Sequence, residues 1–181
     1  MSVAVLLNSA CTGPAPVYRT DATVKDIMDS VVDPNADYIW DSVSTDSSLK
    51  GVIEKAPKTD EDWREVRRRA VALMEAMNML QIPGRKVARP GEKAADPRVE
   101  EPFEVIQTMI DSDRETWLKN TNSLYDATAL ILKAVDAKDK DGILDAGDRI
   151  DKACESCHIK YWYPKQVELL KKQSGSVRKA P

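Results

Sequence analysis

Residues 154–158 read Cys-Glu-Ser-Cys-His, and their types and spacing can do chemistry. Cysteines three positions apart lie on one face of a helix. The sulfurs of Cys154 and Cys157 can therefore both reach the two vinyl groups of one porphyrin. The adjoining His158 can place an imidazole nitrogen beneath the ring as an iron ligand. Because C-x-x-C-H is the attachment sequence of c-type haem, we expect one covalent haem c with His158 as its proximal ligand.

Three other interpretations of the cysteine pair compete with haem attachment. A thioredoxin-like redox pair usually opens a helix that follows a strand, whereas this pair lies deep inside a predicted helix. A zinc site needs further soft ligands, and the remaining cysteine, Cys11, lies in a predicted linker. The pair can also be two core cysteines beside an incidental histidine. A haem-free helical interaction module with a redox or structural cysteine pair therefore stays an alternative.

The second axial position of the iron decides the function. His158 is the only histidine, so two histidines from one chain cannot hold the iron. A methionine, a lysine or other amine, or an open position remains. We propose Met28 as the distal ligand, because Val24, Ile27 and Val31 place it on the apolar face of a helix. A Met ligand saturates the iron and leaves outer-sphere electron transfer, whereas an open position binds CO or NO. Met28 can also simply fill core space.

Apolar residues at helical spacing predict the elements that position these groups. The first helix covers residues 23–44, with Pro34 as a kink or a restart. Thr59 caps a second helix that ends before residues 83–84, which are Pro-Gly. Pro102 opens a third helix that lasts to the charged turn at 137–141, and a fourth runs from there to Pro164. Residues 44–57 and 85–101 read as connections. These elements predict an all-α fold, an antiparallel four-helix bundle with the haem motif on its last helix.

The apolar positions repeat in steps of three and four along three of these helices and predict the core. They are Trp63, Val66, Ala70, Leu73, Met77 and Leu80; Phe103, Ile106, Ile110, Trp117, Leu124, Ala127, Ile131 and Ala134; and Ile143, Gly147, Ile150, Cys154, Cys157 and Tyr161. Tyr161 lies one turn after the cysteine motif. We therefore expect its ring to pack against the haem.

A helical bundle with C-x-x-C-H on its last helix resembles the cytochrome c prime family and its low-spin, Met-ligated relatives. The resemblance covers residues 23–164, and residues 130–161 carry most of it. Tyr161 matches the Tyr of the Tyr-Arg pair that often follows the motif in the family, whereas Trp162 replaces the Arg. The resemblance implies electron transfer with redox partner proteins, with Met28 as the distal ligand. It also implies a gas-binding alternative with a five-coordinate iron, and allows a homodimer.

The start of the chain looks like the end of an export signal. Residues 1–7 are apolar, and residues 7–11 resemble an imperfect lipobox with Cys11 as the acylated residue. An incidental cysteine in a frayed terminus is the alternative. We expect residues 1–22 to be a signal or lipoprotein remnant with a linker, residues 23–172 to form the cytochrome domain, and residues 173–181 to be a disordered basic tail. These features predict a periplasmic protein, lipid-anchored through Cys11.

The composition and the absence of other known motifs argue against several other functional classes. The chain has 181 residues and a net charge of −3, which argues against a nucleic-acid binder. No apolar run approaches the length of a membrane-spanning helix. No carboxylate pair, Ser/His/Asp set or Gly-rich phosphate loop stands out. We therefore expect no substrate-converting enzyme.

Overall fold

The computed structural model describes residues 17–48 and 51–166, and this part of the chain is mostly helical. The predictions for Cys11 and for the tail at 173–181 lie outside it. The elements, in chain order, are α1 (Val24–Ile27), the π-helix η1 (Met28–Val32), α2 (Asp33–Ser42), β1 (Ser44–Ser48), β2 (Gly51–Lys55), α3 (Asp60–Leu80), α4 (Phe103–Ser112), α5 (Arg114–Asp136) and α6 (Lys140–Tyr161).

The first predicted helix forms as one helical run with a π turn inside it. Thr23 and Asp26 make a reciprocal capping box at its start. Pro34 has no N–H, and in an α-helix its ring clashes with the carbonyl of the residue four positions earlier. The run widens just before this proline, where the N–H of Asp33 donates to the carbonyl of Met28, five residues back. Pro34 therefore causes a π turn and neither ends nor restarts the helix.

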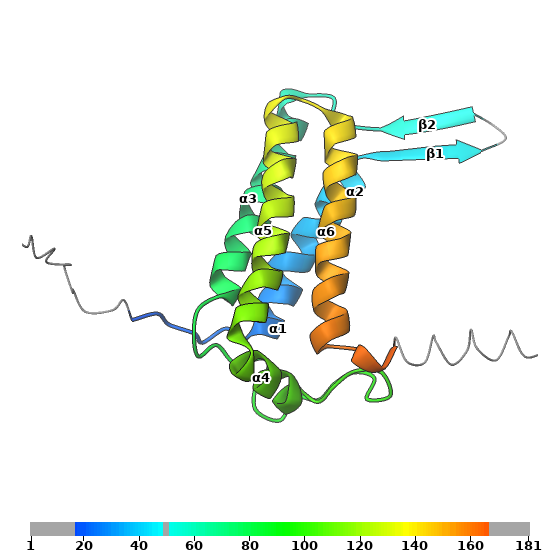
Figure 1. Ribbon diagram of the computed structural model, residues 1–181. Helices are drawn as coiled ribbons and strands as arrows, with labels where there is room; N and C mark the ends of the chain where they lie inside the picture. Colours follow the sequence, from blue (N-terminus) through cyan, green and yellow to red (C-terminus); the bar gives the residue numbers. More distant parts are fainter. Residues whose placement is uncertain (1–16, 49–50, 167–181) are drawn as a thin grey trace, which may run out of the picture.

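Residues 44–48 and 51–55 pair as two antiparallel strands, so the prediction of an all-α chain is wrong in this segment. Ser44 pairs with Lys55, and Ser48 pairs with Gly51. The hairpin projects from one end of the helices (Figure 1), and the side chains of β2 are exposed. Its sequence lacks the alternation of apolar and polar residues that indicates a half-buried strand. An ion pair of 2.8 Å between Lys140 and Glu54 joins it to the start of α6.

The third predicted helix is divided into α4 and α5, because the backbone leaves helical geometry at Asp113. The Asp113 carboxylate accepts the N–H of Thr116 at 3.1 Å and so caps the start of α5. The other carboxylate oxygen accepts Lys160 at 3.0 Å, which ties this corner to α6. The residue that interrupts the predicted helix therefore fixes the angle between α4 and α5.

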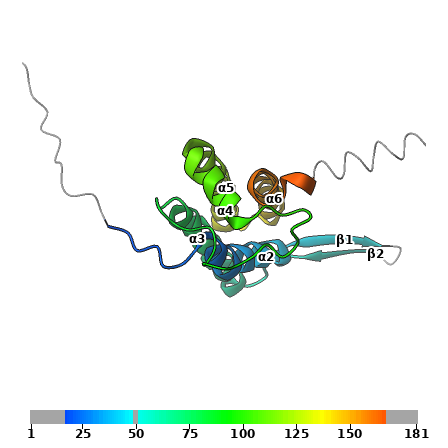
Figure 2. The same cartoon turned by 90° about the horizontal axis from the view of Figure 1, so that it is seen from below.

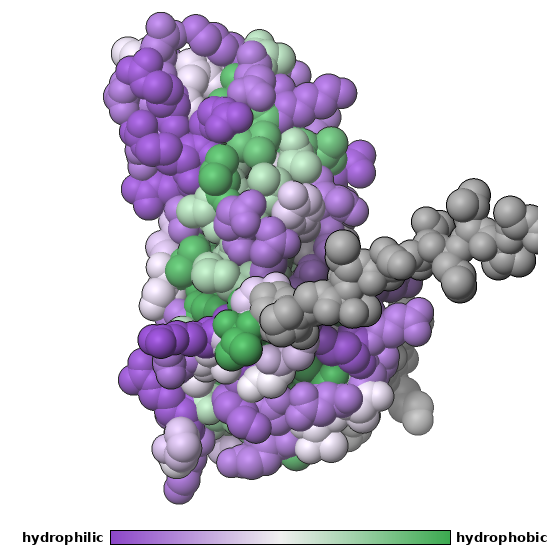
Figure 3. Space-filling view, turned by 90° about the vertical axis from the view of Figure 1, so that its left-hand side faces the viewer, coloured by the Kyte–Doolittle hydropathy of each residue, from purple (hydrophilic) through white to green (hydrophobic). Residues whose placement is uncertain are grey.

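The four longest helical runs lie side by side around an apolar core (Figures 1 and 2). The helix α2 contacts α3 and α6, and α5 contacts the same two helices. The predicted core positions of α3 to α6 are buried, except that Trp63, Cys154 and Cys157 are half-buried. On the side seen in Figure 3, apolar residues gather along the middle and polar residues lie at the margins.

The long loop between α3 and α4 is fixed to the start of α1. The N–H groups of Val24 and Lys25 donate to the carbonyls of Lys86 and Val87 at 2.8 and 3.0 Å. The loop thus satisfies backbone donors at the first turn of a helix, which have no partner within the helix. It also holds the segment that carries Met28 against the rest of the molecule.

Candidate functional site: a cysteine–histidine motif beside a cavity

The motif occupies the last two turns of α6, where Cys154 and Cys157 are half-buried and not in a disulfide. Burial raises the pKa of each thiol to about 12, and the charge of Asp33 adds to the effect on Cys154. Reactive cysteines have a lowered pKa and act as thiolates. Both thiols therefore stay protonated at neutral pH, which argues against an activated redox pair.

His158 is half-buried beside the cysteines. Burial lowers the pKa of its imidazole, although the charges of Asp33 and Glu155 act in the opposite direction. Its Nδ1 lies 2.8 Å from the hydroxyl of Tyr163, while Nε2 has no hydrogen-bond partner within 17–48 and 51–166. The imidazole is thus neutral and has one nitrogen available, which is the form that binds a metal.

Met28 and His158 line the same cavity, although they come from opposite ends of the described chain. The cavity has a volume of about 270 Å³. It is lined by Lys25, Met28, Asp29, Asp33, Lys93, Ala95, Glu100, Phe103, His158, Trp162 and Tyr163. Three elements therefore enclose it: the α1–η1 run, the end of α6, and the loop before α4. The two residues predicted as axial ligands are brought together.

The π turn places Met28 and Asp33 at the cavity. Met28 is the first residue of η1, and Asp33 follows its last residue. Burial raises the pKa of the Asp33 carboxyl. Its neighbour Asn35 is buried and donates to the carbonyl of Val31 at 2.6 Å, which stabilises the widened turn. Asp33 was not predicted as a site residue, because its sequence position indicates only a helix cap before proline.

Tyr161 is not part of this cavity. Its ring is fully buried and packs edge-on against Trp117, with centroids 5.4 Å apart and an interplanar angle of 76°. Its hydroxyl has no hydrogen-bond partner in the described part of the chain. The structure therefore places the ring that we expected beside the haem in the core between α5 and α6, with an unsatisfied buried oxygen.

Tyr163 and Phe103 line the cavity and were not predicted as site residues; Phe103 was predicted only as a core position. Tyr163 lies five residues beyond His158, and an irregular turn after α6 brings its hydroxyl back to the imidazole. Phe103 opens α4 and reaches the cavity because the long loop crosses the end of α6. No local pattern in the sequence indicates the path of that loop.

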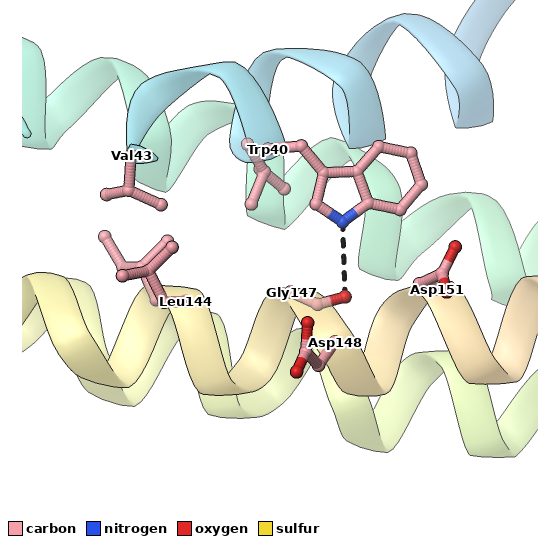
Figure 4. A pocket seen from close by; sticks show the side chains of 8 residues that line it. Trp40, Val43, Leu144, Gly147, Asp148 and Asp151 are labelled. Atoms are coloured by element: carbon pink, nitrogen blue, oxygen red, sulfur yellow. Dashed lines mark hydrogen bonds between the residues drawn. The ribbon is translucent and has the colours of Figure 1, made fainter. Parts of the chain in front are cut away.

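A second cavity of about 320 Å³ lies further along the seam between α2 and α6 (Figure 4). Trp40 crosses it, and its indole N–H donates to the carbonyl of Gly147 at 3.2 Å. A Cβ at Gly147 would lie 3.3 Å from the Trp40 ring, so glycine permits this close approach. Asp151 lines this cavity one turn before Cys154. This second cavity therefore lies earlier along α6 than the cysteine–histidine motif and shares no lining residue with the first.

Residues 17–48 and 51–166 contain no group of three or more His, Cys, Asp or Glu side chains arranged to hold a metal ion. Within the same residues, every helix is too short or too polar to cross a membrane. Comparisons with protein-family models, with curated proteins and with solved structures find no match for this chain.

Proposed function

We propose that this protein is a periplasmic monohaem c-type cytochrome, an antiparallel four-helix bundle that carries electrons by outer-sphere transfer. His158 is the proximal and Met28 the distal ligand in this proposal. The observation that carries it is that the cysteine–histidine motif lies at the end of α6 while Met28 and His158 line one cavity. A haem supplies a one-electron iron couple, whose potential its axial ligands adjust.

The residues present fit this group in their protonation, and His158 lines the cavity, whereas Cys154 and Cys157 lie on the same helix outside its lining. The Cys154 and Cys157 thiols are half-buried, near the core, and lie on adjacent turns of one helix. The imidazole of His158 is neutral and has a free nitrogen.

The volume of the cavity sets a condition on binding. At about 270 Å³ it lies just below the range of about 300–1,000 Å³ typical of ligand pockets. A macrocycle held by Cys154 and Cys157 therefore requires the lining side chains to move apart. The loop that carries Lys93 and Glu100 is the segment expected to move, because helices enclose the other sides.

Within the chain, each group has one task in this proposal. Cys154 and Cys157 anchor the group to α6, and His158 and Met28 hold the iron from two elements. Phe103 and Trp162 line the cavity with apolar surface and exclude water. With both axial positions filled, the site has no room for a substrate, so electrons pass to and from redox partner proteins. The proposal also includes a lipid on Cys11, from the lipobox-like residues 7–11, and a homodimer, from the resemblance to the cytochrome c prime family.

The test uses the full chain produced in a host that attaches c-type haem. We expect haem staining to remain after denaturing electrophoresis, and to disappear in the Cys154→Ala/Cys157→Ala double variant. We expect the reduced protein to show a low-spin spectrum that CO does not change. The variant Met28→Ala should bind CO, whereas Met77→Ala, which removes a buried core methionine of α3, should not.

Two other results of this test would each indicate a different function. If the wild-type protein retains no haem in such a host, the haem-free interaction module replaces the proposal. If it retains haem but is high-spin and binds CO, Met28 is not a ligand, and the gas-binding alternative replaces electron transfer.

A further inference from the structure

The hydrogen bond between His158 and Tyr163 is the closest polar contact of the imidazole. The Tyr163 hydroxyl lies 2.8 Å from Nδ1, and the ring centroids are 5.5 Å apart. The Trp162 ring lies at 6.5 Å and has no hydrogen bond to the imidazole. Two aromatic rings therefore flank His158, and only one of them has a polar atom that reaches it.

The backbone holds Tyr163 rigidly in this position. The N–H groups of Trp162 and Tyr163 both donate to the His158 carbonyl, at 2.8 and 3.0 Å. The Trp162 carbonyl accepts the N–H of Glu101 at 2.7 Å, which fastens the turn to the loop before α4. Burial raises the pKa of the Tyr163 phenol, so the hydroxyl stays neutral. The contact is therefore a fixed neutral hydrogen bond.

We propose that Tyr163 is a positioning residue that accepts the Nδ1–H of His158 and thereby makes Nε2 the nitrogen that binds iron. This inference rests on the proposed function. An imidazole that binds a metal through one nitrogen carries its proton on the other, and the partner of that proton fixes the tautomer and the ring orientation.

The identity of the acceptor also sets how strongly the imidazole donates to iron. A phenol oxygen is a weaker acceptor than an amide carbonyl or a carboxylate. It therefore polarises the Nδ1–H bond only weakly, and His158 stays a moderate electron donor to the iron. A stronger donor stabilises oxidised iron and lowers the reduction potential. Removal of the acceptor should raise the potential, and a stronger acceptor should lower it.

The experiment compares Tyr163→Phe, Tyr163→Gln and Tyr125→Phe as full-length holoproteins with verified haem attachment. Tyr163→Phe keeps the ring and deletes the acceptor. Tyr163→Gln supplies an amide carbonyl, and Tyr125→Phe is the matched control because it deletes the same hydroxyl from a tyrosine of α5 that does not line the cavity. Reduction potentials are measured by spectroelectrochemistry. Proton NMR of the reduced protein follows exchange of the Nδ1–H, which has no other histidine signal to overlap it.

We expect Tyr163→Phe to raise the potential and to speed exchange of the Nδ1–H about tenfold, the effect of one lost hydrogen bond. We expect Tyr163→Gln to lower the potential and keep the exchange slow, and Tyr125→Phe to leave both unchanged. If Tyr163→Phe retains haem with an unchanged potential and exchange rate, the inference is wrong while the cytochrome proposal stands. Absence of haem from the wild-type protein removes the proposed function itself.

Discussion

Arg85 offers a sharp test of how the long loop holds the first helical run. Arg85 is buried, with 8% exposed, and no carboxylate in the part of the chain that the structure describes pairs with it. Its guanidinium donates to the carbonyls of Met79, at 2.9 Å, and of Ala22, at 2.5 Å. It thus connects the end of α3 to the residue just before the α1 cap. The variant Arg85→Met keeps much of the apolar volume and deletes both bonds.

The magnitude follows from the two carbonyls. The Met79 carbonyl also accepts the N–H of Ile82, so it keeps a partner, whereas no other described bond to the Ala22 carbonyl replaces the lost one. Each of the two hydrogen bonds from the charged guanidinium contributes about 1.5–3 kcal/mol, and water can replace the lost partner at Ala22, which is exposed. Release of the guanidinium from burial offsets part of this. We expect Arg85→Met to lower the free energy of unfolding by about 2–4 kcal/mol.

Urea unfolding followed by circular dichroism measures this loss, and the matched control is Arg89→Met. Arg89 also joins the loop to the start of α1, through an ion pair of 2.6 Å with Asp26, but 68% of its side chain is exposed. Exposed pairs contribute about 0–1 kcal/mol. Hydrogen exchange at the Val24 and Lys25 amides should accelerate selectively in Arg85→Met. Equal small losses in both variants would refute the argument that burial makes the Arg85 bonds the stronger link.

Three further predictions concern stability. The hydrogen bonds from Lys160 and Thr116 lower the pKa of Asp113 from its ordinary 3.8 to about 2. The stabilisation that the ionised carboxylate gives the folded state is therefore complete above about pH 4–5 and is lost as the pH falls toward 2. The variant Asp113→Asn should reduce the change in urea midpoint between about pH 7 and pH 3. Thr59→Ala should cost about 1 kcal/mol in urea unfolding, because it removes one half of the capping box of α3; a loss below about 0.3 kcal/mol would contradict this. Ile53→Ser in the hairpin should change unfolding by less than about 0.5 kcal/mol, since 68% of Ile53 is exposed, and a larger loss would mean that the hairpin packs against another surface.

Helical periodicity predicted the core well because each helix buries one stripe of side chains. Val66, Ala70, Leu73 and Met77 repeat in steps of four, three and four, and all are buried on α3. Such a repeat is local and depends only on helix geometry. The start of α3 was likewise predicted from a local pattern, the capping residue Thr59, whose side chain accepts the N–H of Asp62.

The features that sequence reasoning missed depend on contacts between distant segments. Asp113 fits the helical repeat, yet the helix breaks there because its carboxylate caps α5 and binds Lys160. The path of the loop that carries Lys93 and leads to Phe103, at the start of α4, depends on bonds such as that of Arg85. For the candidate site, the motif was evident, and the shared cavity of Met28 and His158 agrees with the placement proposed for them. Their roles as ligands stay predictions.

The π turn before Pro34 has a consequence for the rotational phase of the first helical run. A helix of 3.6 residues per turn advances about 100° with each residue. The i−5 bond from Asp33 to Met28 accommodates one residue more than an α-helical turn does. Because the wide turn takes up this extra residue, the α-helical segments on its two sides stay nearly in phase. Insertion of a further residue beside Ser30, which the turn could not take up, would rotate everything before it by about 100° relative to α2. Met28 would then leave the cavity while the apolar face of α2 stayed in place, so the length of this turn, and not only the identity of residue 28, sets which side chain shares the cavity with His158.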